Sequence, residues 1–270
     1  MFTYAFSRSI DKENIFCFKF ITPVRLALFL ANPTGFNQFV KPHKPYYYAM
    51  NRKITYSFRS LSEVSLFIER PNDWSDFAHF HPKSPIERIS FAQGMVESQF
   101  YDHFLFQMEA ISARIHQEVK VDYTLHKECF ILLMVLDGVI LFQDPSSEDL
   151  IELSAGDCIG VYGESLKSIC QLPPGNCGLC YIIPKNNWSI DNIHLFPIFN
   201  EFWREMRRQY KPFDALPICL INEQMEVAIK KIFFQRWSPK DILKAEPTKD
   251  ISELFFCFHD VVTRKLMQRS

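Results

Sequence analysis

The stretch that decides the fold is residues 130–142, which read Phe-Ile-Leu-Leu-Met-Val-Leu-Asp-Gly-Val-Ile-Leu-Phe. Its first seven residues are all apolar. This run is too short for a lone helix and is typical of a strand buried on both faces. Asp137-Gly138 follows directly, and Asp-Gly tolerates the positive φ angles of a tight hairpin. We therefore predict a buried strand, a tight hairpin turn and a returning strand from Val139 to Phe142.

Period-two patterns extend from this stretch in both directions. Phe104, Phe106 and Met108 alternate with other residues, and the same alternation recurs over residues 119–125. The later strands and turns are expected, in order, at Leu150–Leu153, Ala155-Gly156-Asp157, Cys158–Val161, Leu166–Leu172, Pro173-Pro174-Gly175 and Cys180–Ile183. Short strands at this spacing predict a β-sandwich or barrel, most simply a jelly roll, over residues 86–184.

After Pro184 the apolar spacing becomes that of helices, and we predict a helical region over residues 185–270. One amphipathic face runs from Phe199 to Tyr210, a second helix is expected after an Asn222 cap, and a third begins near Thr248. The apolar stripe of the third helix consists of Ile251, Leu254, Phe255, Phe258, Val262 and Leu266. These six are the candidate dimerisation residues, because so large a stripe must pack on the β domain, on the second helix or on a second copy of the chain. The fold class expected is α+β.

The first 49 residues differ from the rest of the chain. They carry six basic and two acidic residues, and residues 31–48 show no helical or strand periodicity. Two interpretations stay open for residues 1–49. Translation starts at Met50 and the leader is not native, or the leader is a poorly packed basic arm. Residues 50–85 are expected to lead into the β domain.

Composition excludes several classes of protein. Thirty basic residues against thirty-one acidic ones give a net charge of −1, so no global field attracts nucleic acid or an anionic membrane. No apolar stretch reaches the length of a membrane span. The eight cysteines lie mostly in apolar runs, which is typical of free thiols in a reducing compartment. We predict a cytoplasmic protein that does not contact a membrane.

His79, His81 and Glu87 are the weak candidates for metal ligands. A jelly roll of the cupin type holds its metal with His-x-His, a Glu shortly after, and a later His. Glu87 lies one residue beyond that spacing, and the expected later strands contain no His. The sequence therefore predicts no metal and no cofactor. Cys177-x-x-Cys180 is also a poor site, because residues three apart on a strand face opposite sides.

No enzymatic motif stands out in the chain. It has no Gly-x-Ser-x-Gly elbow, no glycine-rich phosphate loop and no His-Glu-x-x-His helix. We therefore expect a protein that is not an enzyme.

The arrangement resembles the N-terminal sensor half of AraC-type bacterial transcriptional regulators, which has a cupin-like jelly roll and a helical dimerisation region. The residues that carry the resemblance are 130–138, the turn 153–157 and the segment 249–255. The resemblance implies a ligand-responsive regulator that forms a homodimer, binds a small-molecule effector and contacts DNA through helix-turn-helix motifs. Those motifs would begin where this chain stops, so the chain itself is expected to be a sensor truncated before the DNA-binding domain.

Two alternatives stay open. A metal-dependent enzyme of the cupin fold is the first, and bound metal would distinguish it. A cyclic-nucleotide-type sensor shares the jelly roll and the following helix. However, residues 160–164, where that fold places its phosphate loop, contain no arginine.

Overall fold

The computed structural model describes residues 52–58, 65–69, 86–145, 147, 149–185, 188, 192–234 and 246–268. The leader at residues 1–49 and the candidate ligands His79 and His81 lie outside the described residues. None of the helices in the described part of the chain combines the length and the apolar character needed to cross a bilayer.

Eight strands form a jelly roll. In chain order they are β5 (Phe106–Ile115), β6 (Val119–Leu125), β7 (Cys129–Asp137), β8 (Val139–Gln143), β9 (Leu150–Ser154), β10 (Asp157–Gly163), β11 (Lys167–Leu172) and β12 (Gly175–Pro184). They pair in nested antiparallel couples, β5 with β12, β6 with β11, β7 with β10 and β8 with β9. This nesting is that of two Greek keys. The predicted antiparallel β-sandwich followed by helices is confirmed.

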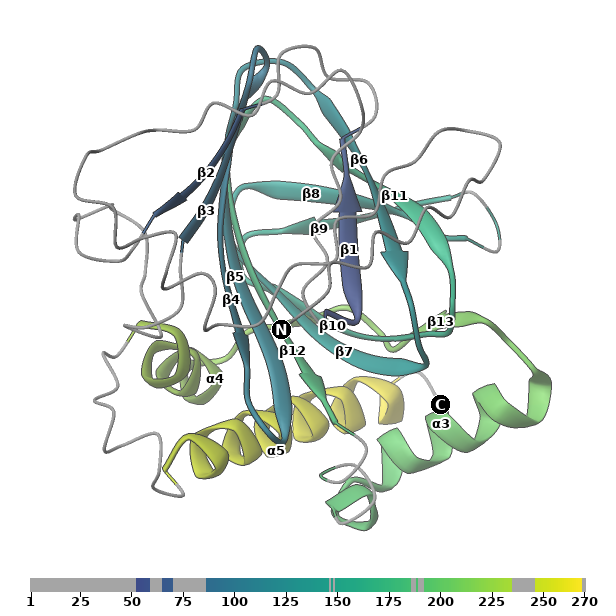
Figure 1. The fold of residues 1–270 in the computed structure, drawn as a ribbon. Coiled ribbons are helices and arrows are strands. Elements are labelled where there is room, and N and C mark those ends of the chain that lie inside the picture. Colours follow the sequence, from purple (N-terminus) through teal and green to yellow (C-terminus); the bar gives the residue numbers. More distant parts are fainter. Residues whose placement is uncertain are drawn as a thin grey trace, which may run out of the picture.

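The strands form two facing sheets (Figure 1). The small sheet has the order β1-β6-β11-β8-β9, and the large sheet has the order β13-β10-β7-β12-β5-β4-β3-β2, with β14 also paired to β10. The added strands are β1 (Ile54–Ser57), β2 (Ser65–Glu69), β3 (Ile86–Phe91), β4 (Gly94–Asp102), β13 (Phe213–Ala215) and β14 (Cys219–Leu220). The sandwich thus also includes strands from outside residues 86–184.

β7 is buried on both faces, as its unbroken apolar run predicts. Its inward side chains, Ile131, Leu133 and Val135, belong to the core between the two sheets. Its outward side chains, Phe130, Leu132 and Met134, belong to a second core between the large sheet and the helices. Two cores on opposite faces of one sheet explain why this strand is continuously apolar instead of alternating.

The tight hairpin predicted at Asp137-Gly138 is wrong. β7 lies in the large sheet and β8 in the small sheet, so the chain turns a corner between sheets instead of folding back. Gly138 has the positive φ (70°) expected of Asp-Gly, and a Cβ there would lie 2.0 Å from the carbonyl oxygen of Asn176. The dipeptide Asp137-Gly138 correctly predicts a glycine with positive φ. Which sheet β7 and β8 each join depends instead on their pairing with β10 and β9, which follow later in the chain.

Phe104 is also not part of a strand, although its spacing from Phe106 suggested so. It lies in the bend between β4 and β5 and is 71% exposed. The backbone N–H of His103 donates to the carbonyl of Phe106 at 2.8 Å, which closes that bend. Phe106 itself is fully buried and starts β5.

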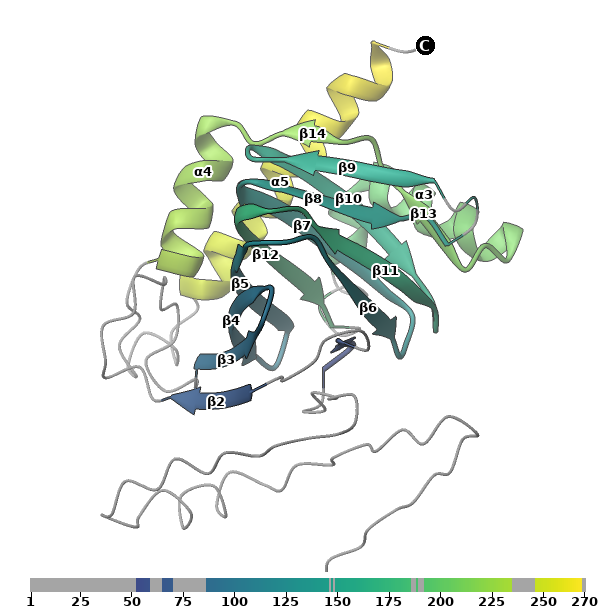
Figure 2. The same ribbon diagram turned by 90° about the horizontal axis from the view of Figure 1, so that it is seen from above.

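Helices cover the outer face of the large sheet, on one side of the sandwich (Figures 1 and 2). They are η1 (Ile193–Leu195), α3 (Pro197–Gln209), α4 (Glu223–Ile229), the π-helical turn η2 (Lys230–Phe234) and α5 (Glu246–Met267). The predicted Asn222 cap is confirmed, since its side chain accepts from the Met225 N–H at 2.9 Å. α5 begins two residues before Thr248, because Pro247 is tolerated in the first turn of a helix.

Candidate ligand-binding site

A cavity of about 130 Å³ lies between the two sheets. Its walls are almost entirely apolar and come from both layers. The small sheet contributes Val121 and Leu172, and the large sheet contributes Leu133 and Ile159. All four side chains point inward because they occupy alternate positions on their strands. The side chains between the two sheets therefore leave an apolar space instead of filling it completely.

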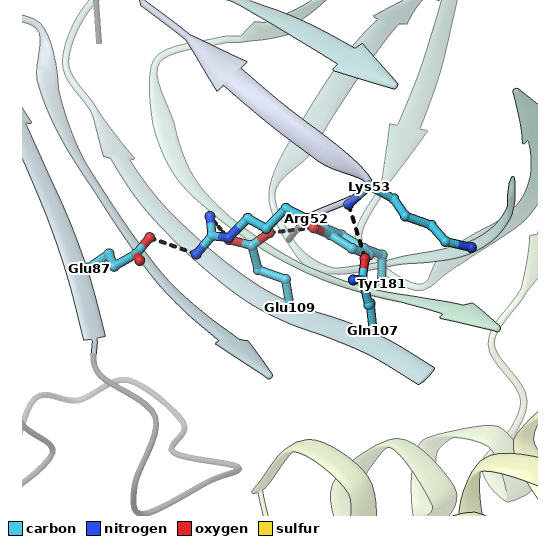
Figure 3. A network of polar contacts seen from close by, with 6 residues as sticks. All are labelled: Arg52, Lys53, Glu87, Gln107, Glu109 and Tyr181. Carbon is cyan, nitrogen blue, oxygen red and sulfur yellow. Dashed lines mark hydrogen bonds and ion pairs between the residues drawn. The ribbon is translucent and has the colours of Figure 1, made fainter. Parts of the chain in front are cut away.

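A charged cluster forms part of the cavity lining, and Figure 3 shows its side chains. Arg52 lies two residues before β1, and its guanidinium reaches across to the large sheet. Nη2 lies 2.7 Å from Oε2 of Glu87 on β3, and Nη1 lies 3.2 Å from Oε1 of Glu109 on β5. All three side chains are buried. One cation thus faces two carboxylates inside the sandwich.

Two aromatic residues complete the cluster. The hydroxyl of Tyr181, on β12, donates to Oε2 of Glu109 (Figure 3). The guanidinium of Arg52 lies over the ring of Phe100, 4.5 Å from its centroid. Both oxygens of Glu109 therefore have a partner, and the planar face of Arg52 rests on an aromatic ring, an arrangement that favours a cation.

The neighbouring residue holds Arg52 in place. The backbone N–H of Lys53 donates to Oε1 of Gln107 on β5 at 3.0 Å, as Figure 3 shows. The Lys53 ammonium donates to the carbonyl of Pro184 at 3.3 Å. β1 then pairs with β6 in antiparallel register, Ile54 opposite Leu125. The start of β1 is thus fastened to both sheets, which directs the Arg52 side chain into the interior.

The buried charges shift one another's pKa values. Burial by itself lowers the pKa of the Arg52 guanidinium, but the carboxylates of Glu109 and Glu87 outweigh burial and raise that pKa above its ordinary value. Burial raises the pKa of Glu87 to about 7, against the opposing effect of Arg52 and with a further contribution from Glu109. One guanidinium cannot fully compensate two buried carboxylates, so the second negative charge is penalised.

The two tyrosine hydroxyls at the cluster stay protonated. Burial, followed by the charge of Glu109, raises the pKa of both Tyr56 and Tyr181 well above its usual value. Each phenol is therefore a hydrogen-bond donor across the physiological pH range. The cluster combines a permanent cation, a carboxyl group that titrates near neutrality, and neutral phenols.

Only one predicted metal candidate lies in the described structure. Glu87 belongs to the cavity, where its partner is Arg52 and not a histidine. Within the described residues, no three His, Cys, Asp or Glu side chains come close enough together to hold a metal ion. Cys177 and Cys180 face opposite cores on β12, as the strand spacing predicts, and both are free thiols.

The candidate dimerisation stripe is largely buried within this chain. The fully buried members are Ile251, Leu254, Phe255, Phe258 and Val262, and Leu266 is half-buried. The ring of Phe255 lies 5.0 Å from Trp188 and 6.4 Å from Phe130 of β7, centroid to centroid. The stripe thus packs on the β domain and its own neighbouring helices. A homodimer stays a prediction, and these side chains are already in contact without one.

Sequence analysis missed Arg52, Glu109 and Tyr181. Glu109 carries the one signal that was available, because it is a lone acid in the apolar run of β5 between Met108 and Ala110. A charge at such a position is costly unless a partner of opposite sign reaches it. The partner is 57 residues away in sequence. No local pattern connects the two.

Comparison with known proteins gives partial likenesses only. No protein-family model and no curated protein matches the sequence. Among solved structures, EutQ of Clostridium difficile is 14% identical over 35% of this chain and 71% of that protein, with a TM-score of 0.27. A cupin superfamily protein from Desulfitobacterium hafniense is 15% identical over 34% of this chain and 78% of that one, with a TM-score of 0.27. ToxT from Vibrio cholerae is 13% identical over 59% of this chain and 57% of its own, with a TM-score of 0.38.

Proposed function

We propose that this chain is a ligand-sensing module that binds a small apolar molecule between its two sheets. The observation that carries the proposal is the apolar cavity of about 130 Å³ whose described lining includes a charged cluster. Concave apolar spaces with a few convergent polar groups and shifted pKa values are the usual form of small-molecule sites. The proposed activity is binding, not catalysis.

The large sheet offers a route from the cavity to the helices. On β12, Tyr181 faces the cavity side and Ile182 faces the helix side. β7 is divided in the same way, and its outward Phe130 touches Phe199 of α3, with ring centroids 5.2 Å apart. A ligand that shifts the inward side chains shifts the strands that support the helices. It would favour the helix arrangement to which it binds more tightly.

The setting that we propose is transcription regulation. The resemblance of residues 130–138, 153–157 and 249–255 to AraC-type sensor halves supports it. In this setting the chain acts as a dimer whose geometry depends on the ligand. Light scattering on the purified chain tests the dimer, for which we expect the mass of two chains. A mass of one chain at micromolar concentration would contradict this part of the proposal.

Native mass spectrometry tests the binding proposal directly. Protein isolated gently from cells should carry a small-molecule mass that is lost on denaturation. The control is Val121→Phe, which fills the cavity from the small sheet and leaves the large sheet unchanged. We expect no bound mass on this variant. The proposal fails if the wild type carries no such mass and no member of a metabolite library raises its melting temperature.

A further inference from the structure

The residues that line the cavity limit which class of ligand it can bind. This inference rests on the proposed binding function. Among the described residues that line the cavity, the charged ones are Arg52, Glu87 and Glu109. An anionic ligand would need the guanidinium as its partner. The guanidinium already faces two carboxylates, one on Nη1 and one on Nη2, and its face rests on Phe100.

A third carboxylate in this space would meet an excess of negative charge. Like charges in a low-dielectric interior repel strongly, and each buried ion also loses its hydration. The cavity has no further described cation to offset these costs. A ligand that carries a carboxylate is therefore disfavoured, even though an arginine is present.

The cluster does have one acceptor to offer. Glu109 accepts a hydrogen bond from Arg52 at Oε1 and one from Tyr181 at Oε2. Glu87 accepts from Arg52 at Oε2, and its side chain lines the cavity. A carboxylate can accept several hydrogen bonds, so a donor that reaches Glu87 from the cavity gains affinity.

The size of the cavity limits the rest of the ligand. Its volume of about 130 Å³ is close to that of an engineered apolar cavity of ~150 Å³ that stays dry and binds benzene. Most of the other described residues that line the cavity are apolar. One ring, or an aliphatic group of similar bulk, fills such a space.

We infer that the cavity selects compact, uncharged, single-ring-sized molecules that carry a hydroxyl group directed at the carboxyl group of Glu87, and that it rejects carboxylates. A hydroxyl both donates and accepts. It can therefore pair with Glu87 in either protonation state, and both states are populated near neutral pH because burial raises the pKa of Glu87 to about 7.

Isothermal titration calorimetry with two matched pairs of probes tests the inference. Phenol and toluene have nearly the same shape and differ in the hydroxyl. Benzamide and benzoate have nearly the same shape and differ in charge. We expect phenol to bind about tenfold more tightly than toluene, as one hydrogen bond to a charged group would give. Benzamide should bind at concentrations at which benzoate does not.

Two variants separate this inference from a purely structural role of the cluster. Glu87→Gln removes one negative charge, so benzoate should gain at least about fivefold in affinity, and the preference for benzamide should shrink. Glu152→Gln removes a charge from an exposed position on β9 and should change nothing.

The outcomes distinguish the inference from the proposed function. If toluene binds as tightly as phenol, or benzoate as tightly as benzamide, the cavity binds ligands but the inferred selectivity is wrong. If none of the four probes binds to the wild type, the inferred ligand class is wrong, whereas the proposed function is decided by the native mass spectrum and the metabolite library. If Glu87→Gln leaves the weak binding of benzoate unchanged, charge is not the cause of its rejection.

Discussion

Glu87 is a buried acid whose pKa differs strongly between the folded and unfolded chain. Its folded pKa is about 7, against 4.5 for an unperturbed glutamate. Between these values the folded state binds more protons than the unfolded state. The free energy of unfolding therefore falls as the pH rises through this window, and the contribution of the protonated carboxyl is fully present only below about pH 4.5.

Glu87→Gln should abolish this part of the pH dependence. We expect the wild type to lose stability from pH 5 to pH 8 by about 1.4 kcal/mol for each unit of pKa difference, and the variant to change much less. Urea unfolding at several pH values measures the effect. Glu152→Gln, at an exposed position, serves as the control and should keep the wild-type slope. An unchanged slope in Glu87→Gln would assign the pH dependence to another group.

The residue types of the buried cluster can be found in the sequence, but their pairing cannot. Glu87 was singled out, but as a metal ligand beside histidines; its partner in the fold is Arg52, 35 residues earlier. Arg52 lies in a segment with no regular pattern before it, and only pairing of β1 with β6 brings it inside. Buried ion pairs depend on tertiary contacts, so the residue types were visible in the sequence while their pairing was not.

At the scale of elements, α5 shows how one helix divides its side chains between core and solvent. Phe255 is 1% exposed and packs among Trp188, Phe196 and Phe199, whereas the adjacent Phe256 is 42% exposed. Phe255→Ala should destabilise the protein by about 3–5 kcal/mol, since it opens a cavity in the second core. Phe256→Ala should cost less than about half as much. Chemical denaturation of the two variants compares them, and equal losses would contradict the difference in burial between Phe255 and Phe256.

The two corners at Gly138 and Gly156 differ in how much space surrounds the glycine. Gly138 and Gly156 both have positive φ, 70° and 91°. A Cβ at Gly138 would lie 2.0 Å from the Asn176 carbonyl oxygen, whereas a Cβ at Gly156 would have no atom within 4 Å. Gly156→Ala should therefore cost only the backbone strain, roughly 1–2 kcal/mol. Gly138→Ala should cost about 3 kcal/mol or more, because the chain around Asn176 must also move. Thermal unfolding of both variants decides the order, and the reverse order would be inconsistent with the corner.

The elements themselves were largely predictable, for a physical reason. Burial imposes a pattern on the sequence. β6 alternates with period two, the apolar stripe of α5 recurs at helical spacing, and β7, buried on both faces, is continuously apolar. The connection at Asp137-Gly138 was not predictable, because a hairpin and a corner between sheets both need a residue with positive φ. The choice between them is made by β10 and β9, which follow later in the chain.

At the scale of the whole molecule, the cavity and the helices share one sheet as their common wall. Trp188 lies in the helix-side core, 5.2 Å from the ring of Phe106 on β5, and does not line the cavity. If the sheet transmits occupancy, the fluorescence of Trp188 should change when phenol fills the cavity. The measurement uses a chain in which Trp74, Trp203 and Trp237 are replaced by Phe, excited where phenol does not absorb.

The same chain with Val121→Phe is the control for this coupling. The added ring occupies the cavity from the side of the small sheet, so the phenol response should disappear. Binding of phenol to the unoccluded chain without any change at Trp188 would show that the sheet does not carry the signal to the helices.

The length and direction of α5 determine how far its C-terminal end moves when the helix tilts. Its 22 residues make a rod of about 33 Å. The buried stripe fixes this rod to the large sheet along most of its length, and its C-terminal end projects beyond the sandwich (Figure 2), where Met267 is exposed. If the whole helix tilted by ~5° about its N-terminal end, its C-terminal end would move by ~3 Å. A small displacement of the strands under α5 would therefore produce a larger movement of the C-terminal end of this helix.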